Sequence, residues 1–277
     1  MSDVAMPDGS TSPVRLFPGA DRALVMVWPG LGMGARYYRP IAEDLAARGF
    51  PVAVGELRGQ GDSTAHASRT ASWGYHDMAS GDYPRTIRAA KEALGLPVEH
   101  PTVLLTHSMG GQIGSLFLAR PEARELNVTG MFGVGSGSPY YRTFDNPERS
   151  RLHFGGYLME GVSRLLGYWP DGRLDVTNYG RQSGVHIGEW ARFGRSNQLR
   201  DLRGADLDYM AAMRTVDVPV LLTRYSDDTY CTLASCEALA ELLPAQVEEF
   251  PGTLGHNRWA REPHDVAERL ERFVAAL

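Results

Sequence analysis

Short apolar segments alternate with amphipathic segments along most of the chain, and this alternation restricts the possible folds more than any other feature. Between the apolar segments, residues such as Tyr38, Ile41 and Leu45 recur at helical spacing. The six apolar segments that we expect to be buried strands are residues 23–28, 52–54, 103–105, 130–134, 218–223 and 247–250. Strands and helices that alternate in this way predict the α/β class, with a doubly wound, mostly parallel sheet.

The alternation is interrupted between residues 140 and 212, where helical fragments occur without a clear strand. A typical connection has roughly 2 to 6 residues, so this stretch predicts an inserted helical cap. We therefore expect residues 1–139 and 213–277 to form the two parts of one core. Residues 140–193 contain 10 of the 26 aromatic residues of the chain. Most of these should build the core of the insertion, and our candidates for contact with a ligand are Tyr157, Trp169 and Trp190.

Charge and hydropathy exclude several classes of partner. The net charge is -5, and the basic residues form no stripe of the kind that nucleic acids or anionic membranes require. Ala23–Trp28, the longest apolar run near the N-terminus, is far shorter than the roughly 20 residues of a membrane-spanning helix. The first dozen residues are polar and lack the pattern of a secretory signal, so we expect a cytoplasmic protein with a disordered leader through about Pro13. Cys231 and Cys236 are expected to be free thiols.

A serine lies in the turn between a predicted strand and a predicted helix. Residues 103–105 lead into Thr106-His107-Ser108-Met109-Gly110-Gly111, and a helix-compatible segment follows. Such a turn places the serine at the end of the sheet in a strained conformation and requires small residues beside it. Gly110 meets this requirement, whereas Thr106 stands where the G-x-S-x-G motif has its first glycine. We predict that Ser108 is a nucleophile.

A serine hydroxyl needs a base, and the base needs a carboxylate that orients it. Asp227 and Asp228 follow the predicted strand 218–223, and either could be this acid. His256 follows the strand 247–250 in a glycine-containing loop and is the predicted base. All three groups would then lie at the carboxyl ends of parallel strands, where functional loops gather.

The order Ser108, Asp228, His256 is the order of the catalytic residues in α/β-hydrolases. From Arg22 to Leu277 the chain resembles serine-nucleophile α/β-hydrolases, especially the capped group with the monoglyceride-lipase-like proteins and a bacterial branch. In that family the acid precedes a short hydrophobic turn. This pattern fits Asp228-Thr229-Tyr230 better than Asp227, which would then support the turn.

The loop after the first predicted strand, Pro29-Gly30-Leu31-Gly32, resembles the His-Gly-x-Gly oxyanion loop of that family, with Pro29 where histidine often stands. The resemblance assigns the oxyanion donors to the backbone N–H groups of Leu31 and Met109. This loop lacks the lysine of a P-loop and the complete G-x-G-x-x-G spacing, so nucleotide binding is not predicted.

Other motifs receive structural interpretations. Arg58-Gly59-Gln60-Gly61-Asp62-Ser63 is similar to the family's R-G-x-G-x-S loop and is interpreted as scaffold. His107, next to the predicted nucleophile, is interpreted as structural. The remaining histidines lack the spacing of metal ligands, and neither a metal nor a cofactor is expected.

These residues predict acyl transfer through a covalent acyl-enzyme, with a small-molecule ester as substrate. The aromatic insertion favours an apolar acyl or aryl group of small to medium size. Two alternatives stay open: a thioesterase or acyltransferase of specialised metabolism, and a non-catalytic ligand receptor on the same fold.

Overall fold

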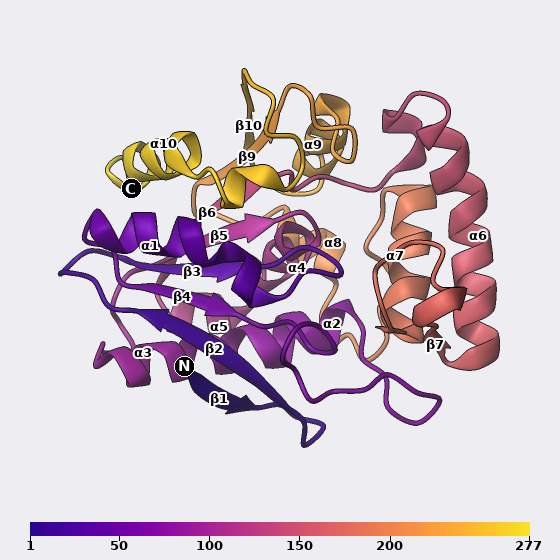
Figure 1. Cartoon of the computed structure of the whole chain (residues 1–277), viewed down its shortest axis with the longest axis horizontal. Coiled ribbons are helices and arrows are strands. Elements are labelled where there is room, and N and C mark those ends of the chain that lie inside the picture. Colours follow the sequence, from indigo (N-terminus) through magenta and orange to yellow (C-terminus); the bar gives the residue numbers. More distant parts are fainter.

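Six parallel strands form the centre of the structure, at the places where the apolar segments predict them. The computed structural model describes all 277 residues and contains an eight-stranded sheet of order β1-β2-β4-β3-β5-β6-β9-β10 (Figure 1). The strands are β1 (Ser2–Ala5), β2 (Thr11–Phe17), β3 (Leu24–Trp28), β4 (Val52–Gly55), β5 (Thr102–His107), β6 (Val128–Val134), β9 (Val220–Tyr225) and β10 (Gln246–Phe250). The strands from β4 to β10 in this order are parallel, and β2 pairs antiparallel with both β1 and β4. The predicted α/β class is confirmed.

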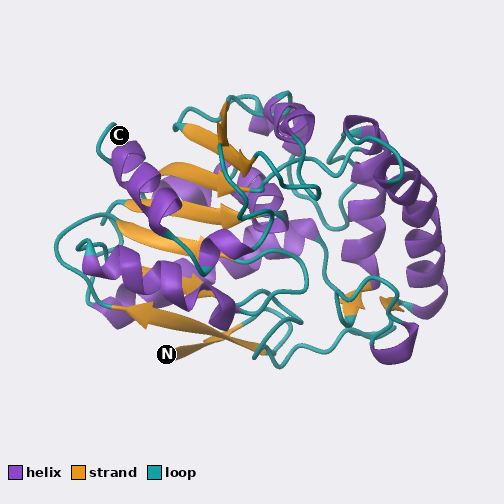
Figure 2. Cartoon of the chain, turned by 45° about the horizontal axis from the view of Figure 1, so that its top comes forward, coloured by secondary structure: helices purple, strands orange, loops and turns teal.

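Helices cover both faces of this sheet (Figure 2). The α-helices are α1 (Arg39–Ala47), α2 (Tyr75–Asp77), α3 (Tyr83–Leu94), α4 (Met109–Leu118), α5 (Pro121–Glu125), α6 (Glu148–Leu166), α7 (Gly184–Ser196), α8 (Tyr209–Met213), α9 (Leu233–Ala240) and α10 (His264–Val274). Short 3-10 helices span Ala35–Tyr38, Tyr141–Thr143, Gly172–Leu174 and Arg258–Ala260, and a π-helical turn spans Met78–Asp82. None of the helices combines the length and the hydropathy that crossing a membrane requires.

Each buried strand contributes side chains to two separate cores. On β3, Leu24 and Met26 point into the larger core, which also contains residues of α3, α4, α8 and α9. Val25 and Val27 point into the smaller core, which is covered by α1 and α10. This arrangement follows from the two-residue period of a strand. It also explains why β3 is apolar throughout, since neither of its faces reaches water.

The N-terminal residues differ from the sequence expectation. The predicted disordered leader through about Pro13 is instead the hairpin β1–β2, which extends the sheet at its antiparallel edge. Val4, Met6 and Val14 are buried in the larger core, and Gly9 provides the positive φ of the turn. The prediction was wrong because these apolar residues are few and are separated by polar ones.

The long connection between β6 and β9 contains a pair of packed helices that stand beside the sheet. Figure 1 shows α6 and α7 lying next to each other at one side of the molecule. A two-stranded ribbon, which the sequence did not predict, joins them: β7 (Tyr168–Trp169) and β8 (Gln182–Ser183). Residue 212, the predicted end of the insertion, falls inside α8, and Tyr209 and Met213 of this helix belong to the larger core.

Candidate active site

Ser108 occupies the sharp turn between β5 and α4. Its φ of 51° and ψ of -121° are unusual for a residue that is not glycine, and strain of this kind often accompanies functional sites. The Ser108 N–H donates to the carbonyl of Val134 at 3.1 Å, which ties the turn to the end of β6. The turn therefore presents the serine side chain at the carboxyl ends of the parallel strands.

Small residues allow the turn to pack closely. A Cβ atom on Gly110 would lie 2.7 Å from the carbonyl oxygen of Pro29, and a Cβ atom on Gly111 would lie 2.4 Å from the Cβ atom of Ser136. Gly111 also faces Thr106, whose hydroxyl lies 3.3 Å from the Ser136 hydroxyl. Gly111 therefore leaves room for Thr106, which stands where the G-x-S-x-G motif has its first glycine.

The structure brings together the three side chains that the sequence analysis selected. His256 Nε2 lies 3.0 Å from Ser108 Oγ, and His256 Nδ1 lies 2.7 Å from Asp228 Oδ2. Asp228 is buried, and its other oxygen accepts the backbone N–H groups of Tyr230 at 2.8 Å and Cys231 at 2.9 Å. A hydroxyl, an imidazole and a buried carboxylate in this sequence of contacts can transfer a proton from the hydroxyl to the imidazole.

The loop that carries Leu31 lies directly against Ser108. A Cβ atom on Gly30 would lie 3.1 Å from the Cβ atom of Ser108. The Gly30 N–H donates to the Tyr38 hydroxyl at 3.0 Å, and the Gly32 N–H donates to Gln60 Oε1. No hydrogen bond within the chain uses the Leu31 N–H. The amides on both sides of Leu31 are therefore fixed, while its own amide stays free to bind a ligand.

A model of the alpha/beta hydrolase fold family matches residues 23–158, which include β3, the Ser108 turn and β6. The chain has the α/β-hydrolase fold. The narrower resemblance to the monoglyceride-lipase-like group stays a prediction. Comparison with curated proteins gives no match.

Three solved structures illustrate the similarity over the whole chain. An esterase from Exiguobacterium antarcticum has 19% identity and a TM-score of 0.64, covering 99% of each chain. An esterase from Rhodococcus sp. ECU1013 has 20% identity and a TM-score of 0.61, covering 100% of this chain and 98% of that one. An alpha/beta hydrolase from Penicillium sp. sh18 has 16% identity and a TM-score of 0.68, covering 99% and 96%. At these identities the comparison shows a shared fold.

The three aromatic residues predicted to contact a ligand occupy different places in this fold. Trp169 is buried in a small cluster with Met159 and Ile187, and both Leu31 and Trp190 pack against that cluster. Tyr157 lies on the exposed side of α6, where Arg195 stacks on its ring. Trp169 and Trp190 therefore share a cluster with the Leu31 side chain, and Tyr157 does not.

Two tyrosines near the triad were not selected from the sequence. The Tyr230 ring lies 5.5 Å from the His256 ring between centroids, and it is exposed. A Cβ atom on Gly32 would lie 3.0 Å from the Cα atom of Tyr179. Burial, with a smaller contribution from Tyr230, raises the pKa of Tyr179. Tyr230 follows Asp228 by two residues, so its closeness in the sequence to the predicted acid could have indicated that it lies near the triad.

The loop interpreted as scaffold holds the Leu31 loop through buried polar groups. Gln60 Nε2 donates to the Gly30 carbonyl at 3.3 Å, so the Gln60 amide contacts the residues on both sides of Leu31. Glu56, which follows β4, accepts the N–H groups of Ala35 at 2.8 Å and Asp62 at 3.2 Å. Burial raises the pKa of Glu56 to about 7, although both hydrogen bonds act in the opposite direction.

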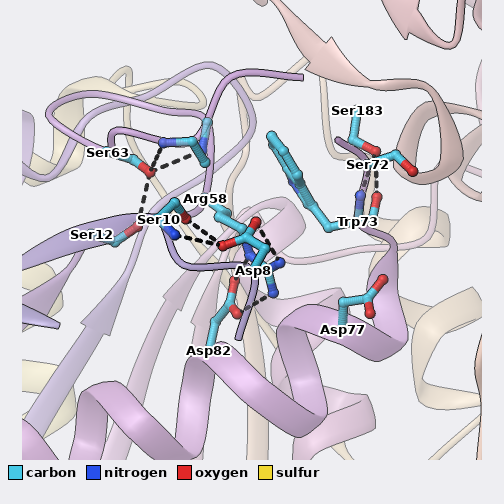
Figure 3. A network of polar contacts seen from close by, with 12 residues as sticks. Asp8, Ser10, Ser12, Arg58, Ser63, Ser72, Trp73, Asp77, Asp82 and Ser183 are labelled. Carbon is cyan, nitrogen blue, oxygen red and sulfur yellow. Dashed lines mark hydrogen bonds and ion pairs between the residues drawn. The ribbon is translucent and has the colours of Figure 1, made fainter. Parts of the chain in front are cut away.

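A buried ionic network holds the loop of residues 58–63 through Arg58 (Figure 3). Arg58 donates to the two carboxylate oxygens of Asp82 at 2.5 and 3.0 Å and to Asp8 at 3.0 Å. Asp8 belongs to the turn between β1 and β2, and Asp82 precedes α3. Burial raises the pKa of Asp82 to about 6, while the hydrogen bond from Arg58 lowers it. The network joins the N-terminal hairpin to the loop beneath the site.

Proposed function

We propose that this protein is a serine hydrolase that cleaves carboxylic esters through a covalent acyl-enzyme. The observation that carries the proposal is the continuous chain of contacts from Ser108 through His256 to the buried Asp228, at 3.0 and 2.7 Å. Such a chain activates a hydroxyl that is otherwise a poor nucleophile near neutral pH.

In the proposed first half-reaction, His256 Nε2 takes the proton of Ser108 while Oγ bonds to the ester carbonyl carbon. The Leu31 and Met109 N–H groups stabilise the oxyanion, and each such donor is worth roughly 3 kcal/mol in the transition state. The imidazolium, held by Asp228, then gives its proton to the departing alkoxide. The products of this half-reaction are the alcohol and an ester of Ser108.

In the second half-reaction, His256 takes a proton from water, whose oxygen bonds to the acyl carbon. The bond between that carbon and Ser108 Oγ then breaks, and Ser108 receives the proton from His256 as the carboxylic acid leaves. Each step uses only the acyl compound, water and groups of this chain.

We propose that the part of the insertion from α6 to α7 caps this site and that the acyl or aryl group is apolar and of small to medium size. The cluster of Met159, Trp169 and Ile187, against which Leu31 and Trp190 pack, supports this proposal because it brings apolar side chains of the insertion to the Leu31 loop. Known proteins of similar fold include esterases and an enzyme that degrades N-acyl homoserine lactones. Lactones therefore belong in the substrate panel.

The test combines covalent labelling with turnover. Purified protein is treated with a fluorophosphonate probe and examined by intact mass and peptide mapping. In parallel, hydrolysis of p-nitrophenyl esters with acyl chains from about two to about twelve carbons ranks the size of the acyl pocket. We expect one adduct, on Ser108, and a loss of turnover of at least about three orders of magnitude in Ser108→Ala. Full turnover in that variant would contradict the proposal.

Two further outcomes separate the alternatives. A preference for thioesters, or transfer of the acyl group to added alcohols in place of water, would identify a thioesterase or an acyltransferase. Tight binding of an ester without adduct or turnover, from folded protein, would identify a receptor on the same fold.

A further inference from the structure

A line of three hydrogen bonds, two of them buried, joins two loops of the site. The Gly30 N–H donates to the Tyr38 hydroxyl oxygen at 3.0 Å, and this hydroxyl lies 2.6 Å from His107 Nδ1. On the other side of the ring, His107 Nε2 lies 2.9 Å from the carbonyl oxygen of His256. The line begins one residue before Leu31 and ends at the backbone of the proposed base.

The direction of every bond in this line follows from the chemistry of the groups. The carbonyl of His256 can only accept, so His107 Nε2 must carry a proton. Burial lowers the pKa of His107 well below its ordinary value, and the neighbouring His256 acts in the same direction. The ring is therefore neutral, Nδ1 is an acceptor, and the Tyr38 hydroxyl donates to it. Burial also raises the pKa of Tyr38, which keeps its proton.

We propose that Tyr38 and His107 are positioning residues that fix the Leu31 loop and the His256 backbone relative to each other across Ser108. This inference rests on the proposed function. Asp228 holds the His256 side chain at Nδ1, and His107 holds the backbone of the same residue. With both ends of the residue held, Nε2 stays within reach of Ser108 Oγ throughout the reaction.

Packing around the line supports this role. The rings of Tyr38 and Trp259 lie 6.1 Å apart, those of His107 and Trp259 lie 5.4 Å apart, and those of His107 and His256 lie 4.8 Å apart. Tyr37 adds a parallel contact, since its hydroxyl donates to the Asn257 carbonyl at 3.1 Å. A neutral His107 so close to His256 also adds no charge that would oppose formation of the imidazolium.

Kinetics of matched variants test the proposal. Tyr38→Phe removes the hydroxyl that accepts from Gly30 and donates to His107, and His107→Met removes both ring nitrogens. We expect kcat to fall at least about tenfold in each variant while KM changes less than about threefold, because substrate contacts remain. His107→Gln should recover most of the loss, since its amide offers an acceptor and a donor at similar spacing.

Tyr209→Phe is the matched control for loss of a buried hydroxyl. The Tyr209 hydroxyl accepts from Arg120 at 2.8 Å, away from the triad. We expect this variant to lose a similar amount of stability in urea while kcat stays within about twofold of the wild type. The proposal is overturned if Tyr38→Phe has wild-type kcat, or if its loss appears in KM alone. It is also overturned if His107→Gln is as impaired as His107→Met.

A spectroscopic measurement separates failure of this proposal from failure of the proposed function. In protein labelled with nitrogen-15 at histidine, the ring resonances that disappear in His107→Gln belong to His107. We expect the neutral form with its proton on Nε2 at neutral pH. A proton on Nδ1 would overturn the proposed line of hydrogen bonds even in an active enzyme. The expected form would support the bond directions even in a protein that cleaves no ester.

Discussion

Asp227 and Asp228 are adjacent in the sequence, yet they contact different groups. The Asp228 side chain is buried and contacts His256 Nδ1, whereas Asp227 is exposed and accepts the Gly255 N–H at 2.9 Å. Both carboxylates therefore hold the histidine loop, one through the imidazole and the other through the backbone. Only the contact of Asp228 can stabilise an imidazolium during the proposed reaction.

Asparagine substitutions at these two positions should have very different effects. Asp228→Asn removes the charge that orients and stabilises His256, so kcat should fall by about three to four orders of magnitude. Asp227→Asn keeps an oxygen that can accept from Gly255, so kcat should stay within about threefold. Steady-state kinetics on the best p-nitrophenyl ester measure both, and the reverse pattern would assign the acid to Asp227.

His186 is a buried histidine that the proposed mechanism does not use. Its ring lies 4.9 Å from the Tyr75 ring, its Nε2 atom has no hydrogen-bond partner, and burial lowers its pKa to about 4. The unfolded chain therefore binds a proton at this residue at higher pH than the folded chain does. This difference makes the folded state lose stability as pH falls from about 6.5 toward about 4.

We expect that His186→Gln flattens this part of the pH profile of stability. Between pH 7 and pH 4.5 the variant should lose about 2 kcal/mol less unfolding free energy than the wild type, because glutamine does not titrate. Urea unfolding at several pH values in this interval measures the difference. Equal losses in the two proteins would show that His186 does not contribute.

At the scale of elements, close approach of α4 to the sheet depends on glycines. The Cβ atom of alanine at position 111 would lie 2.4 Å from both Cβ and Oγ of Ser136, and this overlap can be relieved only by moving α4 or the segment after β6. Because Ser108 precedes α4 directly, such a movement would displace the proposed nucleophile. The geometry of this helix and the chemistry of the site are therefore linked.

Gly111→Ala should destabilise the protein by about 1 to 3 kcal/mol and lower kcat, since overpacking shifts the backbone. Adding Ser136→Gly to this variant should restore part of both losses, because it removes the atoms that overlap. Gly155→Ala in α6 is the control: no atom lies within 4 Å of the new Cβ, so it should stabilise by about 0.5 to 1 kcal/mol. Additive losses in the double variant would argue against the overlap.

Elements with strong local signals were predictable from the sequence, and contacts between distant polar groups were not. All six central strands and the Ser108 turn follow from short apolar runs and glycines. The β1–β2 hairpin has few apolar residues, and its burial depends on the neighbouring β4 and on Asp8 pairing with Arg58. The contacts of Tyr38 and Gln60 with the Leu31 loop join residues 8 and 28 positions apart, and no periodic pattern encodes them.

In the whole molecule, the Arg58 network adds ionic contacts between parts of the chain that also pack in the larger core. Asp8 comes from the edge hairpin, Arg58 from the loop beneath the site, and Asp82 from the start of α3. The side chains of Arg58 and Asp82 are 4% and 1% exposed, so neither charge is shared with water. Asp82 pairs with Arg58 alone, so removing Arg58 leaves the Asp82 carboxylate buried without a cation, whereas Arg58 also pairs with Asp8.

Arg58→Met should lower the unfolding free energy by about 3 to 5 kcal/mol, because Asp82 then lacks its cation. The pKa of Asp82, already raised to about 6 by burial, should rise further without the hydrogen bond from Arg58. A carboxyl whose pKa is higher in the folded chain binds its proton preferentially there, so stability falls as pH increases through this range. The loss of unfolding free energy in Arg58→Met should therefore be larger at pH 8 than at pH 5, as measured by urea unfolding.

Arg39→Met is the control, because it breaks an exposed pair with Glu43 and should cost less than about 0.5 kcal/mol at either pH. A deficit for Arg58→Met as small as that of Arg39→Met, or one that grows at acid pH, would show that the network does not bind these parts together.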